Sequence, residues 1–354
     1  PPRSTLFPYT TLFRSGKEGK YSARLTLRPL PETLYFHPPI LGFTPETFEI
    51  GGLPAGAALE LRLLSRSGWE KDGPSFAPVP IDLRLLAEGL PRWRRPDFEV
   101  FSWNLFPDIL LFDTKDYRTQ NRLFHRLAFF TEKKGYRGRL QPDRVIADRH
   151  GWNAHNYNAG GFAAFFEAAR LNSFPLNEME VWLREYLLAR GVLKKAGEGY
   201  APGRGGALSV SRQSEAAHRR LLLTHEAFHG VYYELPDFRR LAEKTWTALP
   251  PEQKEFWKFF FSWMQYDVTD PGLVVNEFQA YLLQQPVAAA DDYFRKTVAS
   301  RLTGRYPDRK EWLEDLFRRH PAMFTAPARI LSDHLQAAAG FRGGDVFTLR
   351  PRRE

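Results

Sequence analysis

The chain contains no cysteine, and this absence sets the first limits on its chemistry. Without thiols it forms no disulfide bonds, has no thiol nucleophile and offers no thiolate to a metal. Any metal ligands must therefore be histidine, aspartate or glutamate. Long apolar runs are also missing, since the nearest approach to the roughly 18 residues that cross a bilayer is 257–263, which Lys258 and Ser262 interrupt. We therefore expect a soluble protein without a membrane span.

Basic residues outnumber acidic ones by 50 to 41, which gives a formal net charge of +9. They occur in short clusters, such as 92–95, 133–134 and 350–353, and no nucleic-acid-binding module accompanies them. We interpret the clusters as solvated surface and expect no nucleic-acid partner, while an anionic partner such as a cell-envelope polymer stays open. The length of 354 residues and the aromatic content of 15% are sufficient for a large core and two domains.

The sequence predicts three parts and an α+β fold. Residues 1–16 look like translated sequencing-adapter read-through, so we expect a disordered, non-native tail, with any native start and export signal lost. Residues 17–105 predict a small β-rich accessory domain, because short apolar stretches alternate there with proline and glycine. Residues 106–354 predict a mainly α-helical domain that opens on a strand near 108–112. The strands expected in the β domain are 23–27, 33–36, 47–50, 58–64 and 98–103.

The most informative stretch is His225-Glu226-Ala227-Phe228-His229, which lies inside a predicted helix. Positions i and i+4 share one helix face, so both imidazoles can reach one ion, with Glu226 about 100° around the axis. In the His-Glu-x-x-His pattern the two histidines bind Zn²⁺ and the glutamate is the general base toward water. The alternative is two histidines satisfied in a core, but burying them around a glutamate without a metal is costly.

With this motif the sequence resembles the zincin metallopeptidases. The metzincin branch needs a further histidine that does not follow His229 at the required spacing. The gluzincin branch takes its third ligand from a glutamate on a later helix, and residues 274–281 are similar to that helix, including the Asn-Glu pair of thermolysin-like enzymes. The resemblance covers roughly residues 200–290 and implies that His225, His229 and Glu277 bind zinc.

Glu277 stands among apolar residues, where a buried carboxylate needs a partner such as a metal ion. We expect its oxygens within about 4 to 5 Å of the imidazole nitrogens of both motif histidines. Tyr281 departs from the thermolysin-like pattern, which has an aspartate at this position to orient a ligand histidine. A phenol could also donate to the oxyanion of a reacting carbonyl, and the candidates are Tyr232, Tyr233, Tyr266 and Tyr281.

Two further segments bear on substrate binding. Residues 148–157 are polar and aromatic, and we prefer a turn that satisfies its own backbone to a loop that lines a cleft. The spacing between His150 and His155 is unfavourable for a shared second metal ion. Residues 207–211 predict a strand, and in gluzincin-like folds the strand in this region forms the edge on which an extended peptide docks.

Together these features predict a zinc-dependent metallopeptidase that acts on a peptide or protein substrate, with Glu226 as general base and His225, His229 and Glu277 as metal ligands. The alternative is a catalytically silent protein that keeps the zincin-like scaffold for a binding or structural role in the cell envelope. The intact ligands and the intact Glu226 favour the enzyme. The sequence leaves the cleavage specificity, oligomeric state and cellular location open.

Overall fold

The computed structural model describes residues 76–89, 91 and 93–344, together with five short strands outside this range. Residues 1–16 lie outside the described residues, so the expected disorder of that tail is not tested. The five outer strands form two small antiparallel sheets, ordered β2-β1-β4 and β12-β3. These strands are β1 (Tyr21–Arg28), β2 (Thr33–Phe36), β3 (Phe48–Glu49), β4 (Ala58–Ser65) and β12 (Arg350–Pro351).

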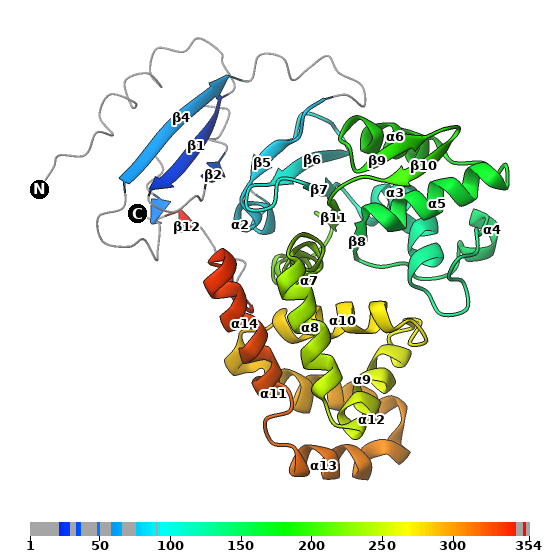
Figure 1. The fold of residues 1–354 in the computed structure, drawn as a ribbon, viewed down its shortest axis with the longest axis vertical. Coiled ribbons are helices and arrows are strands. Elements are labelled where there is room, and N and C mark those ends of the chain that lie inside the picture. The colour runs from blue at the N-terminus through cyan, green and yellow to red at the C-terminus, as the bar shows by residue number, and fades with distance from the viewer. Residues whose placement is uncertain are drawn as a thin grey trace, which may run out of the picture.

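The centre of the molecule is a five-stranded mixed sheet in the order β5-β6-β7-β11-β8 (Figure 1). Its strands are β5 (Val79–Ile81), β6 (Phe98–Trp103), β7 (Ile109–Thr114), β8 (Ala154–Asn158) and β11 (Gly206–Ser211). The strand pairs β5–β6 and β7–β11 are parallel, whereas β6–β7 and β11–β8 are antiparallel. Within the described part of the chain β8 pairs on one side alone, so it is an edge strand.

The strand predicted at 207–211 exists as β11, but it is not the edge of the sheet. It lies between β7 and β8, and its backbone groups are paired on both sides. The prediction that this strand is the docking edge is therefore wrong. The local sequence specifies a strand but not its neighbours, and the edge position next to the motif helix belongs to β8.

Both faces of the central sheet are covered, and the apolar run of β7 reflects this. Ile109 and Leu111 belong to the core shared with the motif helix, whereas Leu110 and Phe112 belong to a second core on the opposite face. Three helices contribute to that second core: α3 (Tyr117–Thr131), α5 (Ala159–Leu171) and α6 (Glu178–Ala189). The remaining elements of the sheet-containing part are α2 (Leu83–Ala87), α4 (Asp143–Ile146), β9 (Leu193–Ala196) and β10 (Gly199–Pro202).

The domain boundary predicted between residues 105 and 106 falls between β6 and β7, two hydrogen-bonded antiparallel neighbours of one sheet. Phe101 pairs with Leu111 across this hairpin, and Ser102 pairs with Leu110. The predicted strand 98–103 therefore belongs to the central sheet, while β1, β2 and β4 form a separate sheet.

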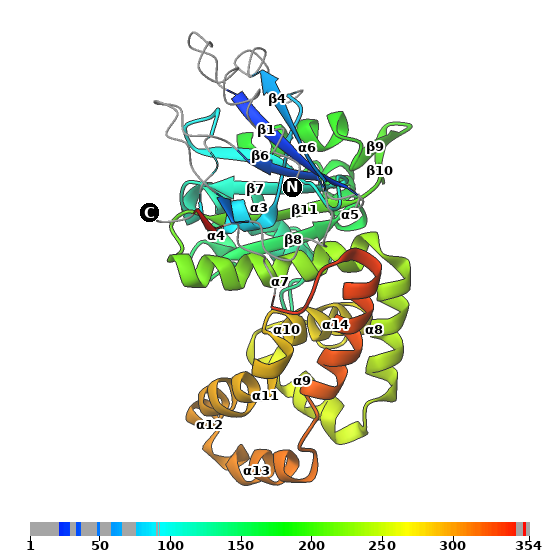
Figure 2. The same ribbon diagram turned by 90° about the vertical axis from the view of Figure 1, so that its left-hand side faces the viewer.

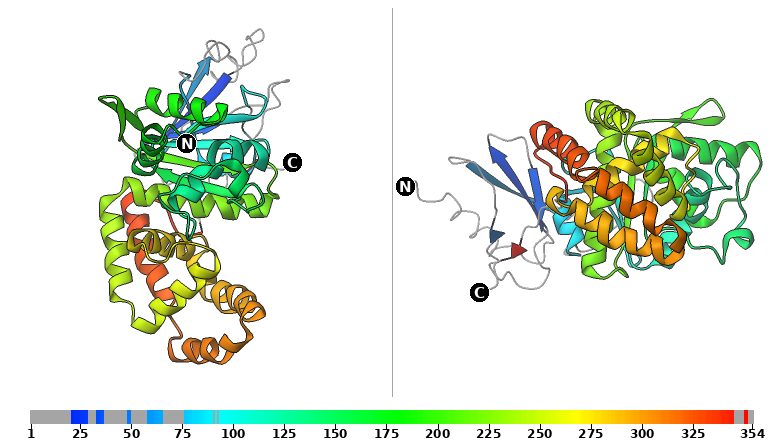
Figure 3. Two further views of the ribbon diagram at one scale, coloured as in Figure 1. Left: turned by 90° about the vertical axis from the view of Figure 1, so that its right-hand side faces the viewer. Right: turned by 90° about the horizontal axis from the view of Figure 1, so that it is seen from below.

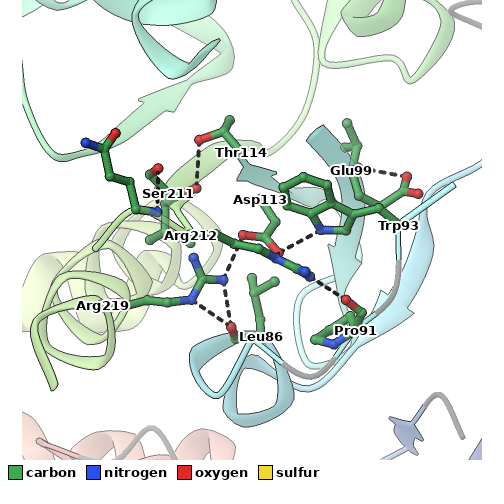
Figure 4. A network of polar contacts seen from close by, with 12 residues as sticks. Leu86, Pro91, Trp93, Glu99, Asp113, Thr114, Ser211, Arg212 and Arg219 are labelled. Carbon is green, nitrogen blue, oxygen red and sulfur yellow. Dashed lines mark hydrogen bonds and ion pairs between the residues drawn. The ribbon is translucent and has the colours of Figure 1, made fainter. Parts of the chain in front are cut away.

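Helix α7 (Ala216–Glu234) carries the His-Glu-x-x-His motif and lies along the central sheet (Figure 2). Its close approach depends on Gly230, because a Cβ built there would meet Trp103 Cζ3 at 3.2 Å and Leu208 Cδ1 at 3.5 Å. At its first turns, Arg219 reaches back to the buried Asp113 at 2.8 Å and to the Leu86 carbonyl at 2.7 Å (Figure 4). These contacts fix the helix against β7 and α2.

The second half of the chain is helical and lies on the far side of α7 from the sheet (Figures 2 and 3). Its helices are α8 (Pro236–Ala248), α9 (Pro251–Trp263), α10 (Pro271–Leu283), η1 (Val287–Ala289), α11 (Ala290–Asp292), η2 (Tyr293–Val298), α12 (Ala299–Arg305), η3 (Pro307–Arg309), α13 (Lys310–Arg319) and α14 (Thr325–Ala339). Phe256, Trp257, Phe294 and Phe324 pack ring against ring at its centre. A small N-terminal β sheet and a mainly helical remainder confirm the predicted α+β class. None of the described helices is long and apolar enough to cross a membrane.

Candidate metal centre and cleft

Helices α7 and α10 bring His225, His229 and Glu277 together. The Nε2 atoms of the two histidines lie 3.1 Å apart. The Glu277 carboxylate lies 3.5 Å from Nε2 of His225 through Oε2, and 3.7 Å from Nε2 of His229 through Oε1. Both distances lie within the limit of about 4 to 5 Å expected from the sequence, so the predicted placement of Glu277 is confirmed. One potential ligand atom from each of the three residues lies within 4.8 Å of the other two.

The two histidines are in the protonation state that a metal ion requires. Burial lowers the pKa of His225 and of His229 to about 4, so both rings are neutral near pH 7 and each has a lone pair to donate. Glu277 is 1% exposed, and its Oε2 has no hydrogen-bond donor among the described residues. A buried carboxylate oxygen of this kind needs a positive partner. The three residues therefore form a site that can hold a metal ion.

Gln284 orients the first histidine. Its Oε1 lies 3.0 Å from Nδ1 of His225, so Nδ1–H donates to the amide and Nε2 keeps its lone pair toward Glu277. Tyr281 instead packs its ring against that of His225, with centroids 4.5 Å apart. Gln284 thus supplies the orienting contact that the resemblance assigned to an aspartate at position 281. It follows Glu277 by seven residues, a spacing that keeps both on one helix face.

Glu226 lies on α7 beside the three candidate ligands, 5% exposed. Its Oε2 accepts a 2.9 Å hydrogen bond from Nδ2 of Asn156, and the hydroxyl of Tyr233 donates to Oδ1 of the same asparagine. Burial raises the pKa of Glu226 well above its usual value, and the charges of Glu277 and Glu132 raise it further. A carboxylate with a raised pKa and a fixed orientation is suited to accept a proton and pass it on.

Asn156 comes from β8, so the edge strand and the motif helix meet at Glu226. A cleft of about 730 Å³ opens at this junction, and both His225 and Glu226 line it. Of the four tyrosines considered from the sequence, Tyr266 and Tyr281 line the cleft. Burial raises the pKa of both phenols well above 10, so both are protonated donors near pH 7.

Segment 148–157 divides between the cleft and the core. His150, Trp152 and Asn153 line the cleft, as the loop alternative required, while residues from 154 onward form β8. His155 is 2% exposed, and its Nδ1 lies 2.8 Å from the hydroxyl of Tyr157 on the sheet side. The preferred prediction of a self-satisfied turn is therefore wrong for this segment. The two histidines face different surroundings, in agreement with their unfavourable spacing.

Comparison with known proteins identifies no relative: no protein-family model matches the chain, no curated protein matches it, and no solved structure matches its fold.

Proposed function

We propose that this protein is a zinc-dependent, gluzincin-like metallopeptidase in which His225, His229 and Glu277 bind the metal and Glu226 is the general base. The observation that carries the proposal is the placement of a buried His-His-Glu group beside a second, separately oriented carboxylate. A protein that used the group to hold a structural ion would not need Glu226 in the cleft. This placement favours the enzyme over the catalytically silent scaffold.

The chain's own residues supply the remaining parts of a hydrolytic site. The free edge of β8 offers backbone donors and acceptors to an extended peptide of any sequence. Asn156 holds the Glu226 carboxylate in place to take the proton of an attacking water and to return it to the leaving amine. The phenols of Tyr266 and Tyr281 line the cleft as candidate donors to the developing oxyanion, and Tyr266 also hydrogen-bonds to Glu277. Bound zinc would supply the Lewis acidity for this chemistry.

The test separates metal binding from turnover. Glu226→Gln should retain stoichiometric zinc, measured by elemental analysis, yet cleave peptides about 10²- to 10⁴-fold more slowly, because a general base contributes rate enhancements of that order. Glu234→Gln is the matched control at the last residue of the same helix, and it should keep full activity. A Glu226→Gln variant that cleaves a peptide library normally would refute the mechanism. Stoichiometric zinc in a wild-type protein that cleaves no peptide would support the silent scaffold.

A further inference from the structure

The cleft has a cationic end, built at the junction between the sheet and the helical part. After α3 ends, Glu132 and Lys134 form backbone hydrogen bonds of 3.1 Å with Asp267 and Gln265, the segment that joins α9 to α10. Lys133 and Tyr266 pair as a β-bridge between these hydrogen bonds. This bridge ties together the two walls of the cleft and holds the side chain of Lys133 in its lining.

Lys133 is a buried cation that forms no salt bridge with any described residue, although the neighbouring Glu132 carboxyl group attracts its charge. Its side chain is 7% exposed, and its ammonium lies 3.2 Å from the centroid of the Trp152 ring and 3.4 Å from the Gly151 carbonyl oxygen. In the described residues no carboxylate oxygen lies within 4.0 Å of the ammonium. The adjacent Glu132 instead accepts a 2.8 Å hydrogen bond from Nε1 of Trp152. A desolvated ammonium in this position is costly unless an anion joins it.

Trp152 connects this cation to the candidate metal centre. Its ring stacks on that of Tyr266, with centroids 4.8 Å apart, and both rings line the same cleft as His225. At the mouth of this end the cleft is also lined by Arg149, which is exposed and stacks its guanidinium 5.3 Å from the Tyr136 ring. An inner and an outer cation on one path attract an anionic group along it.

The edge strand gives the direction in which a peptide would meet Lys133. Antiparallel pairing is the more stable and the more common arrangement for an added strand. A peptide antiparallel to β8 runs from the end of the strand toward its start at Ala154, beyond which lie Trp152 and Lys133. Asn156 contacts Glu226, and Trp152 is four positions before it; four residues of an extended peptide span about 13 Å. Lys133 therefore faces the residues that follow the cleaved bond.

We propose that Lys133 is a specificity-determining residue that binds a carboxylate of the substrate, located within about four residues on the C-terminal side of the cleaved bond. The carboxylate is either the side chain of an acidic residue or the C-terminal group of the peptide. The inference rests on the proposed peptidase function for the meaning of the cleaved bond. The anion site itself follows from the surroundings of Lys133 alone.

The experiment uses the zinc-loaded full chain and a set of peptides, with cleavage positions read by mass spectrometry. One arm compares glutamate with glutamine at each of the four positions after the bond, and the other compares free C-terminal carboxylates with amides. The wild type should favour one carboxylate series by about 10- to 100-fold in kcat/KM, the range of a charged hydrogen bond. Lys133→Met and Lys133→Gln should lose this preference, while Lys133→Arg should keep part of it.

Lys258→Met is the matched control, since Lys258 is an exposed lysine on α9 outside the cleft lining. It should keep the full preference. Titration calorimetry with the same peptides measures carboxylate-dependent binding even if none is cleaved. Cleavage or binding that is indifferent to the carboxylate, or a preference that survives Lys133→Met in folded protein, would overturn the inference. Carboxylate-dependent binding without cleavage would overturn the proposed peptidase function and leave the anion site standing.

Discussion

Replacing Arg219 with methionine should test how α7 is held in place. Asp113 is fully buried and accepts hydrogen bonds from Nη2 of Arg219 at 2.8 Å, Nε of Arg212 at 3.0 Å and Nε1 of Trp93 at 2.9 Å (Figure 4). Arg219 also donates to the Leu86 carbonyl at 2.7 and 3.1 Å. Arg219→Met removes a buried cation, and the Asp113 carboxylate and the Leu86 carbonyl each lose the hydrogen bonds that Arg219 donates.

Breaking a buried ion pair by removing one partner typically costs about 3 to 5 kcal/mol. Arg212 remains beside Asp113, so we expect the lower end, about 3 kcal/mol, for Arg219→Met. The measurement is the free energy of unfolding from urea titration of the metal-free protein, with circular dichroism as the probe. Metal-free conditions exclude any contribution from ligand binding.

The adjacent arginine is a matched control. Arg220 pairs with Glu88, but the two side chains are 43% and 29% exposed, and exposed pairs contribute about 0 to 1 kcal/mol. Arg220→Met should therefore change the free energy of unfolding by less than about 1 kcal/mol. Equal effects of the two substitutions would show that the buried network does not hold α7, and the reasoning from burial would be refuted.

Two further predictions concern groups around the cleft. Burial raises the pKa of Glu132 to about 8, so the folded metal-free protein retains this proton while the unfolded chain releases it near 4.5. The free energy of unfolding should therefore fall as pH rises from about 5 to 8. Glu132→Gln should remove this fall, so that the difference in unfolding free energy between variant and wild type shifts in favour of the variant over this pH range. Parallel pH profiles of the two proteins would contradict the prediction. Gln284→Leu should weaken zinc binding by about 10- to 100-fold, because it removes the acceptor that orients His225. Competition with a zinc-chelating dye measures the affinity, and Gln285→Leu is the control that should leave it unchanged. An unchanged zinc affinity in Gln284→Leu would exclude an orienting role for Gln284.

The motif and its third partner could be predicted because their signals are local. The i, i+4 spacing of His225 and His229 fixes their common face once a helix forms, and α7 forms over that stretch. Glu277 stands out as a carboxylate in an apolar stretch, and α10 includes the residues 274–281 that resemble the third-ligand helix. In both helices the relevant information lies within a few turns of the chain.

The rest of the site depends on pairings that the sequence does not display. Asn156 and Glu226 are 70 positions apart, and they meet because β8 is the sheet edge next to α7. Strand periodicity predicts 207–211 as a strand but says nothing of its two neighbours. The bridge between Lys133 and Tyr266 joins segments that follow two different helices, and no short pattern marks either one. The role of Gln284 could have been predicted from the sequence, since Gln284 lies two helical turns after Glu277.

The convergence of α7 and α10 on one His-His-Glu group gives this cysteine-free chain a route to a cross-link. An ion held by His229 and Glu277 would close a loop of 48 residues, the separation of the two ligands in the sequence. For a covalent link that closes a loop of this length, the loss of entropy in the unfolded chain amounts to about 4 kcal/mol. Removal of the ion by a chelator would therefore act on this protein as reduction acts on a disulfide-bonded one. Its resistance to unfolding would then depend on the free concentration of that ion in its surroundings and not on their redox potential.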